Sequence, residues 1–341
     1  MATIVQDRPS ALLETSFLSP VQADLEEVER VLLNEIRSDV RKAYEISGHI
    51  LSAGGKRLRP AALVLAARAT CNAFPVRAIY ASASAVELIH MASLIHDDVV
   101  DGAETRRGRP TANAAFGSQI SVLVGDYLLA KSIHLGSREG NMDVIRIFSK
   151  VTVGLSEGEV LQITHRGNPE TSEQTYFDII TRKTARFISG CCEIGAVLAE
   201  GSEVVVGALA RFGLNIGLAF QIADDILDFL GDPLVTGKPR CSDVREGKMT
   251  LPLIAAYRRL PSGSPLRSEL AKWIQNPEGL TEEQERQICS MIVEYDGFDY
   301  ARRTASDLIE RSRDDIESVL RDSIYRDSLF ALAGYALGRK H

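Results

Sequence analysis

The spacing of apolar residues constrains the fold of this chain more than any other feature of its sequence. Apolar side chains recur every three or four residues along almost the whole chain, which is the period of an α-helix. Only 12 prolines and 6% aromatic residues are present, so little material is left for β-strands and their turns. We therefore predict an all-α protein, with helices over 60–71, 76–98, 119–135, 143–165, 172–199, 203–229 and 250–259 and a further group beyond Pro265.

The same pattern predicts how the helices assemble. The first helix is expected to start at Ser19-Pro20, as a capping residue and the first helical position, and to carry an apolar stripe made of Leu25, Val28, Val31, Leu32 and Ile36. Later helices contain long apolar or small-residue stretches, which place them inside a bundle. No low-complexity linker divides the chain, so we predict one helical domain over residues 19–341 and an N-terminal extension over residues 1–18 that could be flexible.

The charge balance limits the classes of ligand. The chain has 39 Lys and Arg against 46 Asp and Glu, a formal net charge of −7, so its surface is not expected to bind nucleic acid. No uninterrupted apolar run approaches the ~18–20 residues of a membrane span, and the N-terminus lacks a secretion signal. The 5 cysteines fit neither a disulfide framework nor a zinc spacing. We therefore expect a cytoplasmic protein with free thiols.

Two copies of the pattern D-D-x-x-D stand out. In a helix, residues four apart share a face, so each copy can present paired carboxylates to one point, and oxygen-only ligands suit Mg²⁺ or Mn²⁺. A single copy would more often be a solvated helix end, but both copies follow apolar runs, where clustered carboxylates repel unless cations bind. If the two helices face each other, they form a multi-metal site. The first copy comprises Asp97, Asp98 and Asp101, and the second comprises Asp224, Asp225 and Asp228.

Basic residues flank both aspartate motifs. Arginine binds phosphate through a planar fork and lysine binds it as a point charge, so such clusters could hold a second diphosphate without a metal. There is no phosphate-binding loop of nucleotide-binding proteins and no strand-linked glycine fingerprint. The expected ligands are therefore diphosphates attached to an apolar group. The flanking cations are Lys56, Arg57, Arg59, Arg106, Arg107, Lys238 and Lys248.

With these motifs the chain resembles the trans-isoprenyl diphosphate synthases, also called polyprenyl synthetases, over roughly residues 25 to 340. The resemblance implies the isoprenoid synthase fold, a helical bundle around a central cavity for substrate and product, and typically a homodimer. The motifs that carry it run in family order: Gly54-Gly-Lys-Arg-Leu-Arg-Pro60, Glu87-Leu-Ile-His90, Asp97-Asp-Val-Val-Asp101, Arg106-Arg-Gly108, Gly125-Asp126, Lys183-Thr184, Gln221 with Asp224-Asp-Ile-Leu-Asp228, and Gly237-Lys238 before Glu246-Gly-Lys-Met-Thr-Leu-Pro252.

The resemblance implies a prenyltransferase that joins isopentenyl diphosphate head to tail (1′-4) to an allylic diphosphate such as farnesyl or geranylgeranyl diphosphate. About three Mg²⁺ ions, replaceable by Mn²⁺, would neutralise the leaving diphosphate. Asp97, Asp101 and Asp224 would hold these ions, with Asp98, Asp225 and Asp228 in support. The released diphosphate would take up the proton lost from the product, so no protein residue is assigned as general base.

The same resemblance divides the polar residues between the two substrates. Isopentenyl diphosphate would bind to Lys56, Arg59, His90 and Arg107. The allylic diphosphate would bind to Arg106, Lys183, Lys238 and Lys248, with Thr184 and Gln221 near the reacting carbons. His96, next to Asp97, is better explained as a packed or hydrogen-bonding histidine than as a ligand, because adjacent helical residues point apart.

The sequence departs from the family pattern at few places. Gly102-Ala103 replaces a pair that is often acidic or polar, and Cys241 stands where the family commonly has glycine. Neither departure removes an expected ligand. Asp243 could assist the second metal motif or only cap the local turn.

Small residues ahead of the first motif indicate a long product. Ala92 and Ser93 stand where short-chain family members often carry an aromatic side chain, and Ile89 lies one turn deeper, with Leu129 and Ile133 as candidates for the tunnel floor. The helix over 76–98 spans roughly 33 Å, and an isoprene unit adds about 5 Å. A product of about C30 to C45, suited to a quinone side chain, follows from this length. Small residues packed between helices are the alternative explanation.

Three other functions remain open at this point. A short-chain farnesyl or geranylgeranyl diphosphate synthase differs only in tunnel length. A class I terpene cyclase or a squalene-type synthase would not need the isopentenyl diphosphate residues. A non-catalytic subunit of a heteromeric synthase would tend to lose aspartates, whereas all six are present. A long prenyl product must leave the enzyme into a lipid bilayer. We therefore expect the protein to contact a membrane transiently, although no transmembrane segment is predicted.

Overall fold

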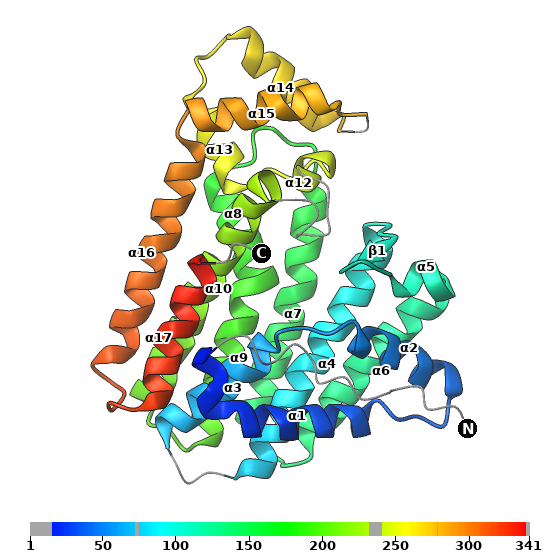
Figure 1. The fold of residues 1–341 in the computed structure, drawn as a ribbon, viewed down its shortest axis with the longest axis vertical. Helices are drawn as coiled ribbons and strands as arrows, with labels where there is room; N and C mark the ends of the chain where they lie inside the picture. Colours follow the sequence, from blue (N-terminus) through cyan, green and yellow to red (C-terminus); the bar gives the residue numbers. More distant parts are fainter. Residues whose placement is uncertain (1–15, 72–74, 232–240, 278, 339–341) are drawn as a thin grey trace. The chain divides into compact units, whose positions relative to one another are not determined.

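The computed structural model describes residues 16–71, 75–231, 241–277 and 279–338. Within these residues the chain is almost entirely helical, as predicted (Figure 1). Contacts between backbone positions divide it into two compact units. Unit 1 comprises residues 1–152, 190–210 and 316–331, and unit 2 comprises residues 153–189, 211–315 and 332–341. Whether the chain forms one domain over residues 19–341 remains a prediction.

The elements before residue 140 belong to unit 1. They are a 3₁₀ turn η1 (Ser16–Val21), the helices α1 (Gln22–Glu35), α2 (Arg41–Ser52), α3 (Leu58–Thr70) and α4 (Val76–Val100), the strands β1 (Thr105–Arg106) and β2 (Arg109–Pro110), and the helices α5 (Ala112–Phe116) and α6 (Ser118–Ser137).

The remaining helices belong to unit 2 or run from one unit into the other. They are α7 (Met142–Thr164), α8 (Glu173–Ile180), the π-helical turn η2 (Thr181–Ala185), α9 (Arg186–Leu198), α10 (Glu203–Leu230), α12 (Ser242–Arg245), α13 (Leu251–Arg259), α14 (Pro265–Gln275), α15 (Glu282–Glu294), α16 (Gly297–Glu317) and α17 (Ile324–Leu337).

Helix α4 forms the core of unit 1 and ends in the first aspartate motif. Its most extensive contact is with α6, and it also packs on α1, α3 and α5 (Figure 1). Most of its side chains are buried, including Leu88, Ile89 and Met91. Burial of a side chain of this size stabilises the fold by roughly 1.5–3 kcal/mol. This helix therefore gives the motif a rigid base.

The start of the chain differs in detail from the sequence expectation. Pro20 lies inside the 3₁₀ turn η1, and α1 begins at Gln22, so the prediction that Ser19 caps the first helix was wrong. The apolar stripe is confirmed for Leu25, Val28, Leu32 and Ile36, which are buried. Val31 is only partly buried. Helix α2 and the β1–β2 hairpin were not predicted.

Two helices, α4 and α10, are long and apolar enough to cross a membrane by length and composition, although polar residues interrupt the apolar run in both. In α4, 78% of the most apolar stretch is buried inside the protein, and in α10 the share is 50%. The burial of α4 is that of a core helix.

Candidate active site

The first aspartate motif lies at the C-terminal end of α4. Asp101 follows the last helical residue, yet its φ of −84° and ψ of −5° continue the helical path, and its N–H donates to the Asp97 carbonyl at 2.8 Å. Asp97 and Asp101 therefore keep the one-turn relation that was predicted from their spacing. Asp97 is partly buried and Asp101 is exposed.

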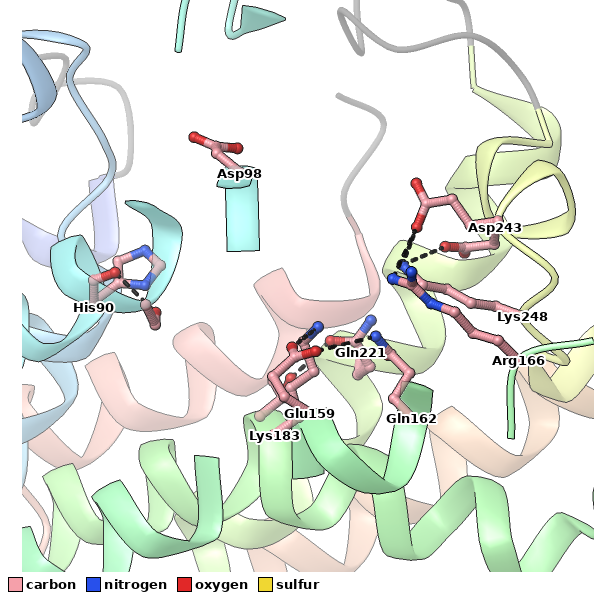
Figure 2. Close-up of polar contacts among 12 residues, drawn as sticks. His90, Asp98, Glu159, Gln162, Arg166, Lys183, Gln221, Asp243 and Lys248 are labelled. Atoms are coloured by element: carbon pink, nitrogen blue, oxygen red, sulfur yellow. Dashed lines mark hydrogen bonds and ion pairs between the residues drawn. The ribbon is translucent and has the colours of Figure 1, made fainter. Parts of the chain in front are cut away.

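Asp98, between them, lies in a different environment. It is 5% exposed, and its Oδ1 accepts a hydrogen bond from Arg106 Nε at 2.9 Å and forms an ion pair with Arg106 Nη2 at 2.8 Å. Figure 2 shows Asp98 at the end of its helix. A buried carboxylate needs such a partner. Asp98 thus fixes Arg106, one of the predicted diphosphate ligands.

A tight hairpin turn presents Arg107. The turn joins β1 to β2, and its two central residues, Arg107 and Gly108, have φ angles of 53° and 72°. Positive φ at both positions is the signature of a type I′ turn. The Arg107 guanidinium donates to the Gly54 carbonyl, and a Cβ at Gly55 would lie 3.1 Å from its Nη1. Glycine at position 55 therefore lets Arg107 approach.

Arg57 has a structural role in the adjacent loop. It precedes α3 with a φ of 49°, and its buried guanidinium pairs with Glu29 at 3.0 Å and Glu87 at 2.9 Å. These two carboxylates come from α1 and α4. Arg57 thereby holds the loop in place, while its neighbour Lys56 is exposed and Arg59 is partly buried.

Positive charges of unit 1 act on His90. Burial lowers the pKa of His90 well below its usual value, and the charges of Arg59, Arg107, Arg106 and Arg57 lower that pKa further. The same surroundings of burial and positive charge lower the pKa of Arg107. A Cβ at Gly55 would lie 3.1 Å from Arg107 Nη1 and 3.2 Å from Arg57 Nη1, so both guanidinium groups lie beside this glycine. That Arg59, His90 and Arg107 bind isopentenyl diphosphate stays a prediction.

His96 is a hydrogen-bonding histidine, as predicted. Its Nε2 lies 3.2 Å from the Val122 carbonyl and 3.4 Å from the Asp126 carboxylate, both on α6. Gly125 on the same helix faces the imidazole so closely that a Cβ there would clash with the ring. The Gly125-Asp126 motif therefore supports helix packing beside the first aspartate motif.

The second motif contains a buried hydrogen-bonded chain. Asp225 is 4% exposed, and its carboxylate accepts from Tyr176 Oη at 2.6 Å and from Gln221 Nε2 at 2.9 Å. Thr184 Oγ1 donates in turn to Gln221 Oε1 at 2.8 Å. Burial raises the pKa of Asp225, and burial together with the Asp225 charge raises the pKa of Tyr176. Asp224, next to Asp225 in the sequence, is only partly buried.

Lys183 and Thr184 lie in the π-helical turn η2, which interrupts the helix formed by α8 and α9. Such turns are frequent at functional sites because they change the direction in which side chains point. Lys183 forms an ion pair with Glu159 of α7, close to Gln221 (Figure 2). A Cβ at Gly158 would lie 2.8 Å from the Lys183 backbone nitrogen, so glycine allows this contact.

The segment after residue 240 holds Asp228. Ser242 Oγ donates to Asp228 Oδ1, the Asp243 N–H donates to Asp228 Oδ2 at 3.1 Å, and the Cys241 N–H donates to the Asp228 carbonyl at 2.9 Å. The backbone N–H of Asp243 therefore helps to hold the Asp228 carboxylate in place. The Asp243 side chain lies 3.9 Å from Lys248, which also pairs with Glu246 (Figure 2). Lys238 lies outside the described residues.

The predicted chain-length residues belong to α4. Ile89 and Ala92 are buried, and Ser93 is partly buried with its hydroxyl donating to the His90 carbonyl at 2.9 Å. Ile133 on α6 is 52% exposed, which does not fit its predicted place in a tunnel floor. Leu129 is partly buried.

Comparison with known proteins decides the family. The polyprenyl synthetase model matches residues 40–292, well over half of the chain. The chain belongs to the polyprenyl synthetase family.

Relatives and a solved structure agree with this assignment. An all-trans-nonaprenyl-diphosphate synthase (geranyl-diphosphate specific) from Rhodobacter capsulatus is 38% identical over 94% of this chain and 97% of its own. An octaprenyl diphosphate synthase from Haemophilus influenzae is 36% identical over 93% and 94%. A polyprenyl synthase of Caulobacter crescentus, crystallised with calcium and isoprenyl diphosphate, superposes with a TM-score of 0.89 at 35% identity, over 98% of this chain and 100% of its own.

The polyprenyl synthetase described here is therefore a prenyltransferase with the isoprenoid synthase fold, and its relatives support a medium- or long-chain trans-polyprenyl diphosphate synthase. Two further residues contact predicted site residues and were not identified in the sequence analysis: Tyr176 and Glu159. Tyr176 precedes Thr184 by two helical turns, so helical spacing could have placed both on one face. Glu159 gave no such signal, because only folding brings it to Lys183. Glu246 begins a motif that carried the family resemblance, but its pairing with Lys248 was not predicted.

Proposed function

We propose that this polyprenyl synthetase extends farnesyl or geranylgeranyl diphosphate with isopentenyl diphosphate by head-to-tail (1′-4) condensation. The observation that carries the proposal is the contact of the hairpin with the loop that holds Lys56 and Arg59, made where the Arg107 guanidinium donates to the Gly54 carbonyl. An anion site built from arginines, next to the helix that ends in an aspartate motif, supplies what two diphosphate substrates need. One diphosphate binds to basic side chains and the other to metal.

The basic site fits isopentenyl diphosphate. Arg59 and Arg107 offer planar forks to phosphate oxygens, and exposed Lys56 adds a mobile positive charge. The lowered pKa keeps His90 neutral at pH 7, so one ring nitrogen carries a proton that it can donate to a phosphate oxygen. The Arg57 ion pairs with Glu29 and Glu87 hold the loop that carries Lys56 and Arg59.

The aspartate motifs fit Mg²⁺. Among the residues described, no group of three or more His, Cys, Asp or Glu side chains is gathered closely enough to hold a metal. Mg²⁺ usually takes one or two carboxylates and completes its shell with water and substrate phosphate, so a large protein cage is not required. Partly or fully exposed Asp97, Asp101 and Asp224 suit direct ligation. Bound Mg²⁺, about three ions with Mn²⁺ as a substitute, would stabilise the charge of the departing diphosphate.

The other three aspartates suit a supporting role. Asp98, Asp225 and Asp228 each accept hydrogen bonds from protein groups. We propose that they orient the direct ligands and the cations around them. This is the same division of the six aspartates that the family resemblance implied.

The allylic diphosphate is proposed to bind to Arg106, Lys183, Lys238 and Lys248. An ion pair with Asp98 holds Arg106 in place. Lys183 forms an ion pair with Glu159, and Lys248 forms one with Glu246. A diphosphate therefore competes with these glutamates for the two lysines. Thr184 and Gln221, joined by a hydrogen bond, place polar atoms near the reacting carbons.

The chemical step forms one carbon–carbon bond in each cycle. The bond between C1 and oxygen of the allylic diphosphate breaks, and the alkene carbon C4 of isopentenyl diphosphate bonds to that C1. The product loses one proton, which the released diphosphate takes up. The protein's task is to align the alkene with C1 and to keep water away from the cation, which together account for a large share of such a rate enhancement.

A product of about C30 to C45 is proposed from the length of α4 and the small side chains of Ala92 and Ser93. Nonaprenyl and octaprenyl diphosphate synthases among the relatives support this range. Such a product suits a quinone side chain and would leave through transient contact with a membrane.

The proposal includes a homodimer in the cytoplasm. Val122, Leu123 and Ile133 expose apolar side chains along α6, a surface that a second copy of the chain would cover. The free state of Cys71, Cys191, Cys192, Cys241 and Cys289 suits a reducing compartment.

The decisive experiment incubates the purified chain with Mg²⁺, farnesyl diphosphate and radiolabelled isopentenyl diphosphate and sizes the products. We expect a ladder that ends at six to nine isoprene units, about C30 to C45. Chelation should abolish the reaction, and Mg²⁺ or Mn²⁺ should restore it. A ladder ending at C20 would indicate a short-chain synthase, and no extension would indicate a non-catalytic subunit or a cyclase.

Substitutions of two arginines in the β1–β2 hairpin test the proposed isopentenyl diphosphate site. Arg107→Ala is expected to raise the KM for isopentenyl diphosphate by about 100-fold, because a charged phosphate contact is worth roughly 2–3 kcal/mol. Arg109→Ala is the matched control, since Arg109 lies in the same hairpin and donates to the Ser52 carbonyl at 3.0 Å. Equal effects of the two substitutions would show that Arg107 acts through the hairpin alone.

A further inference from the structure

Two cysteines far apart in the sequence lie side by side in unit 2. The Sγ atoms of Cys241 and Cys289 are 3.6 Å apart. Cys241 directly precedes α12 and is fully buried, whereas Cys289 lies on α15 and is partly exposed. A small oxidant can therefore reach Cys289, with Cys241 next to it as the second thiol.

A second contact fixes the two elements in register. Arg245 of α12 forms an ion pair with Glu285 of α15. Arg245 follows Cys241 by one helical turn, and Glu285 precedes Cys289 by one turn. The ion pair and the thiol pair are thus neighbouring contacts along one interface, so the closeness of the two sulfur atoms follows from the packing of α12 on α15.

The backbone at Cys241 is in an unfavourable conformation for a cysteine. Its φ of 56° and ψ of 28° lie in the left-handed region. There the Cβ of a residue other than glycine is crowded by the backbone, so the conformation carries strain. In this conformation the Cys241 side chain lies against Cys289 and its N–H donates to the Asp228 carbonyl.

We propose that Cys241 and Cys289 form an oxidisable dithiol site whose substrate is a peroxide. Cys289, as its thiolate, attacks the O–O bond of hydrogen peroxide, which yields a sulfenic acid on Cys289 and one water molecule. The Cys241 thiol then attacks that sulfur, forms the disulfide and releases a second water molecule. Two thiols and one peroxide thus give one disulfide and two waters, and the peroxide accepts both electrons.

The disulfide would act on the second aspartate motif, an inference that rests on the proposed function of Asp228. A disulfide requires an S–S distance of about 2.05 Å, so the sulfur atoms must approach each other by more than 1 Å. Cys289 is held by helix α15, whereas Cys241 belongs to the segment that donates to Asp228. A displacement of about 1 Å near a reacting centre can lower a rate by up to 100-fold. We expect oxidation to lower kcat by about tenfold.

The other cysteines do not offer such a pair. Cys191 and Cys192 are adjacent on α9 and buried, and neighbouring helical residues point in different directions. Cys71 lies in unit 1 and therefore serves as a control.

The test treats the full-length, reduced protein with hydrogen peroxide and maps disulfides by mass spectrometry of its peptides. A peptide linking Cys241 to Cys289 is expected, together with a tenfold loss of kcat that dithiothreitol reverses. Cys71→Ser should respond like the natural chain, whereas Cys289→Ser and Cys241→Gly should keep their activity in peroxide. The two variants remove the pair from opposite sides, so a folding defect in one leaves the other informative.

Other results would contradict either the dithiol site or its effect on Asp228. Full consumption of peroxide without the Cys241–Cys289 peptide would overturn the dithiol site. The peptide without a change in kcat would overturn its coupling to Asp228. Because the mass spectrum needs no substrate, a reduced protein without prenyltransferase activity would refute the proposed function and leave the dithiol result readable.

Discussion

Asp98 and Asp225 are the second aspartates of the two D-D-x-x-D motifs, and both are buried and hydrogen-bonded within the protein. Asp98 accepts from Arg106, and Asp225 accepts from Tyr176 and Gln221. Their neighbours Asp97 and Asp224 are partly exposed. In both motifs a buried carboxylate thus stands next to one that is partly exposed.

The Tyr176→Phe substitution tests whether the buried Asp225 supports the function of the second motif. Tyr176→Phe removes the hydroxyl that donates to Asp225, so we expect kcat to fall about tenfold and the Mg²⁺ requirement to rise, with a loss of stability of about 1–2 kcal/mol. Tyr257→Phe is the control, because Tyr257 donates to Glu170 at 3.1 Å in the same unit. Steady-state kinetics and thermal unfolding of both variants provide the measurement. Equal kcat values would mean that Tyr176 only stabilises the fold.

Ala92 tests the chain-length prediction. Replacing this buried residue of α4 with Leu and then Phe adds increasing volume ahead of the first motif. If the growing chain passes here, the products should shorten step by step. By resemblance to short-chain family members that carry an aromatic side chain near this position, Ala92→Phe should stop at about three or four isoprene units. Chromatography of radiolabelled products measures this. Unchanged products from a folded Ala92→Phe protein would assign Ala92 to helix packing.

At the scale of elements, two short irregular segments place the charged side chains. The β1–β2 hairpin carries Arg106 and Arg107 back over the end of α4, and the π-helical turn η2 interrupts a long helix at Lys183 and Thr184. Regular helices supply the rigid frame, and these interruptions set the direction of the basic groups. Neither interruption has a hydrophobic period of its own, so the pattern of apolar residues does not reveal it.

A substitution at Gly108 can strain the β1–β2 turn while every charged side chain of the hairpin is kept. Gly108→Ala places a Cβ at a φ of 72°, which costs about 1 kcal/mol, and open space around the residue excludes a clash. We expect a several-fold higher KM for isopentenyl diphosphate, because the turn positions Arg107. Gly263→Ala imposes the same strain at a φ of 85° in unit 2 and should leave this KM unchanged. Equal KM values for the two variants would contradict the role of the turn.

At the scale of the whole molecule, the exposed apolar side chains of α6 suit an interface between two copies. Leu123 is 61% exposed and Ile133 is 52% exposed, and helical spacing places them on one side of α6 with Val122. Helix α6 is also the main packing partner of α4, so an interface there would support the helix that carries the first aspartate motif.

The dimer prediction has a direct test. We expect light scattering of the natural protein to report twice the mass of one chain, 37.3 kDa. Leu123→Asp combined with Ile133→Asp places charges in the proposed interface, so this double variant should have a mass near that of one chain. Val40→Asp adds a charge at another exposed apolar residue of unit 1 and should leave the mass unchanged. A double variant that keeps the mass of the natural protein would place the interface elsewhere.

The helical class and the two aspartate motifs could be read from the sequence by itself. A period of three to four apolar residues and carboxylates one turn apart are local properties, and the spacing of each pair survives in the structure even where α4 ends at Val100. The order of the motifs also indicated the family, which the comparisons confirmed.

Only the tertiary structure decided which of these residues are anchored and by which partners. Tyr176 and Asp225 are 49 positions apart, and Cys241 and Cys289 are 48 apart, so no local pattern links them. The burial of Asp98 and Asp225 likewise depends on the helices packed around them. Periodicity records which face of a helix is apolar, whereas the pairing of buried polar groups depends on contacts that form only when distant segments fold together.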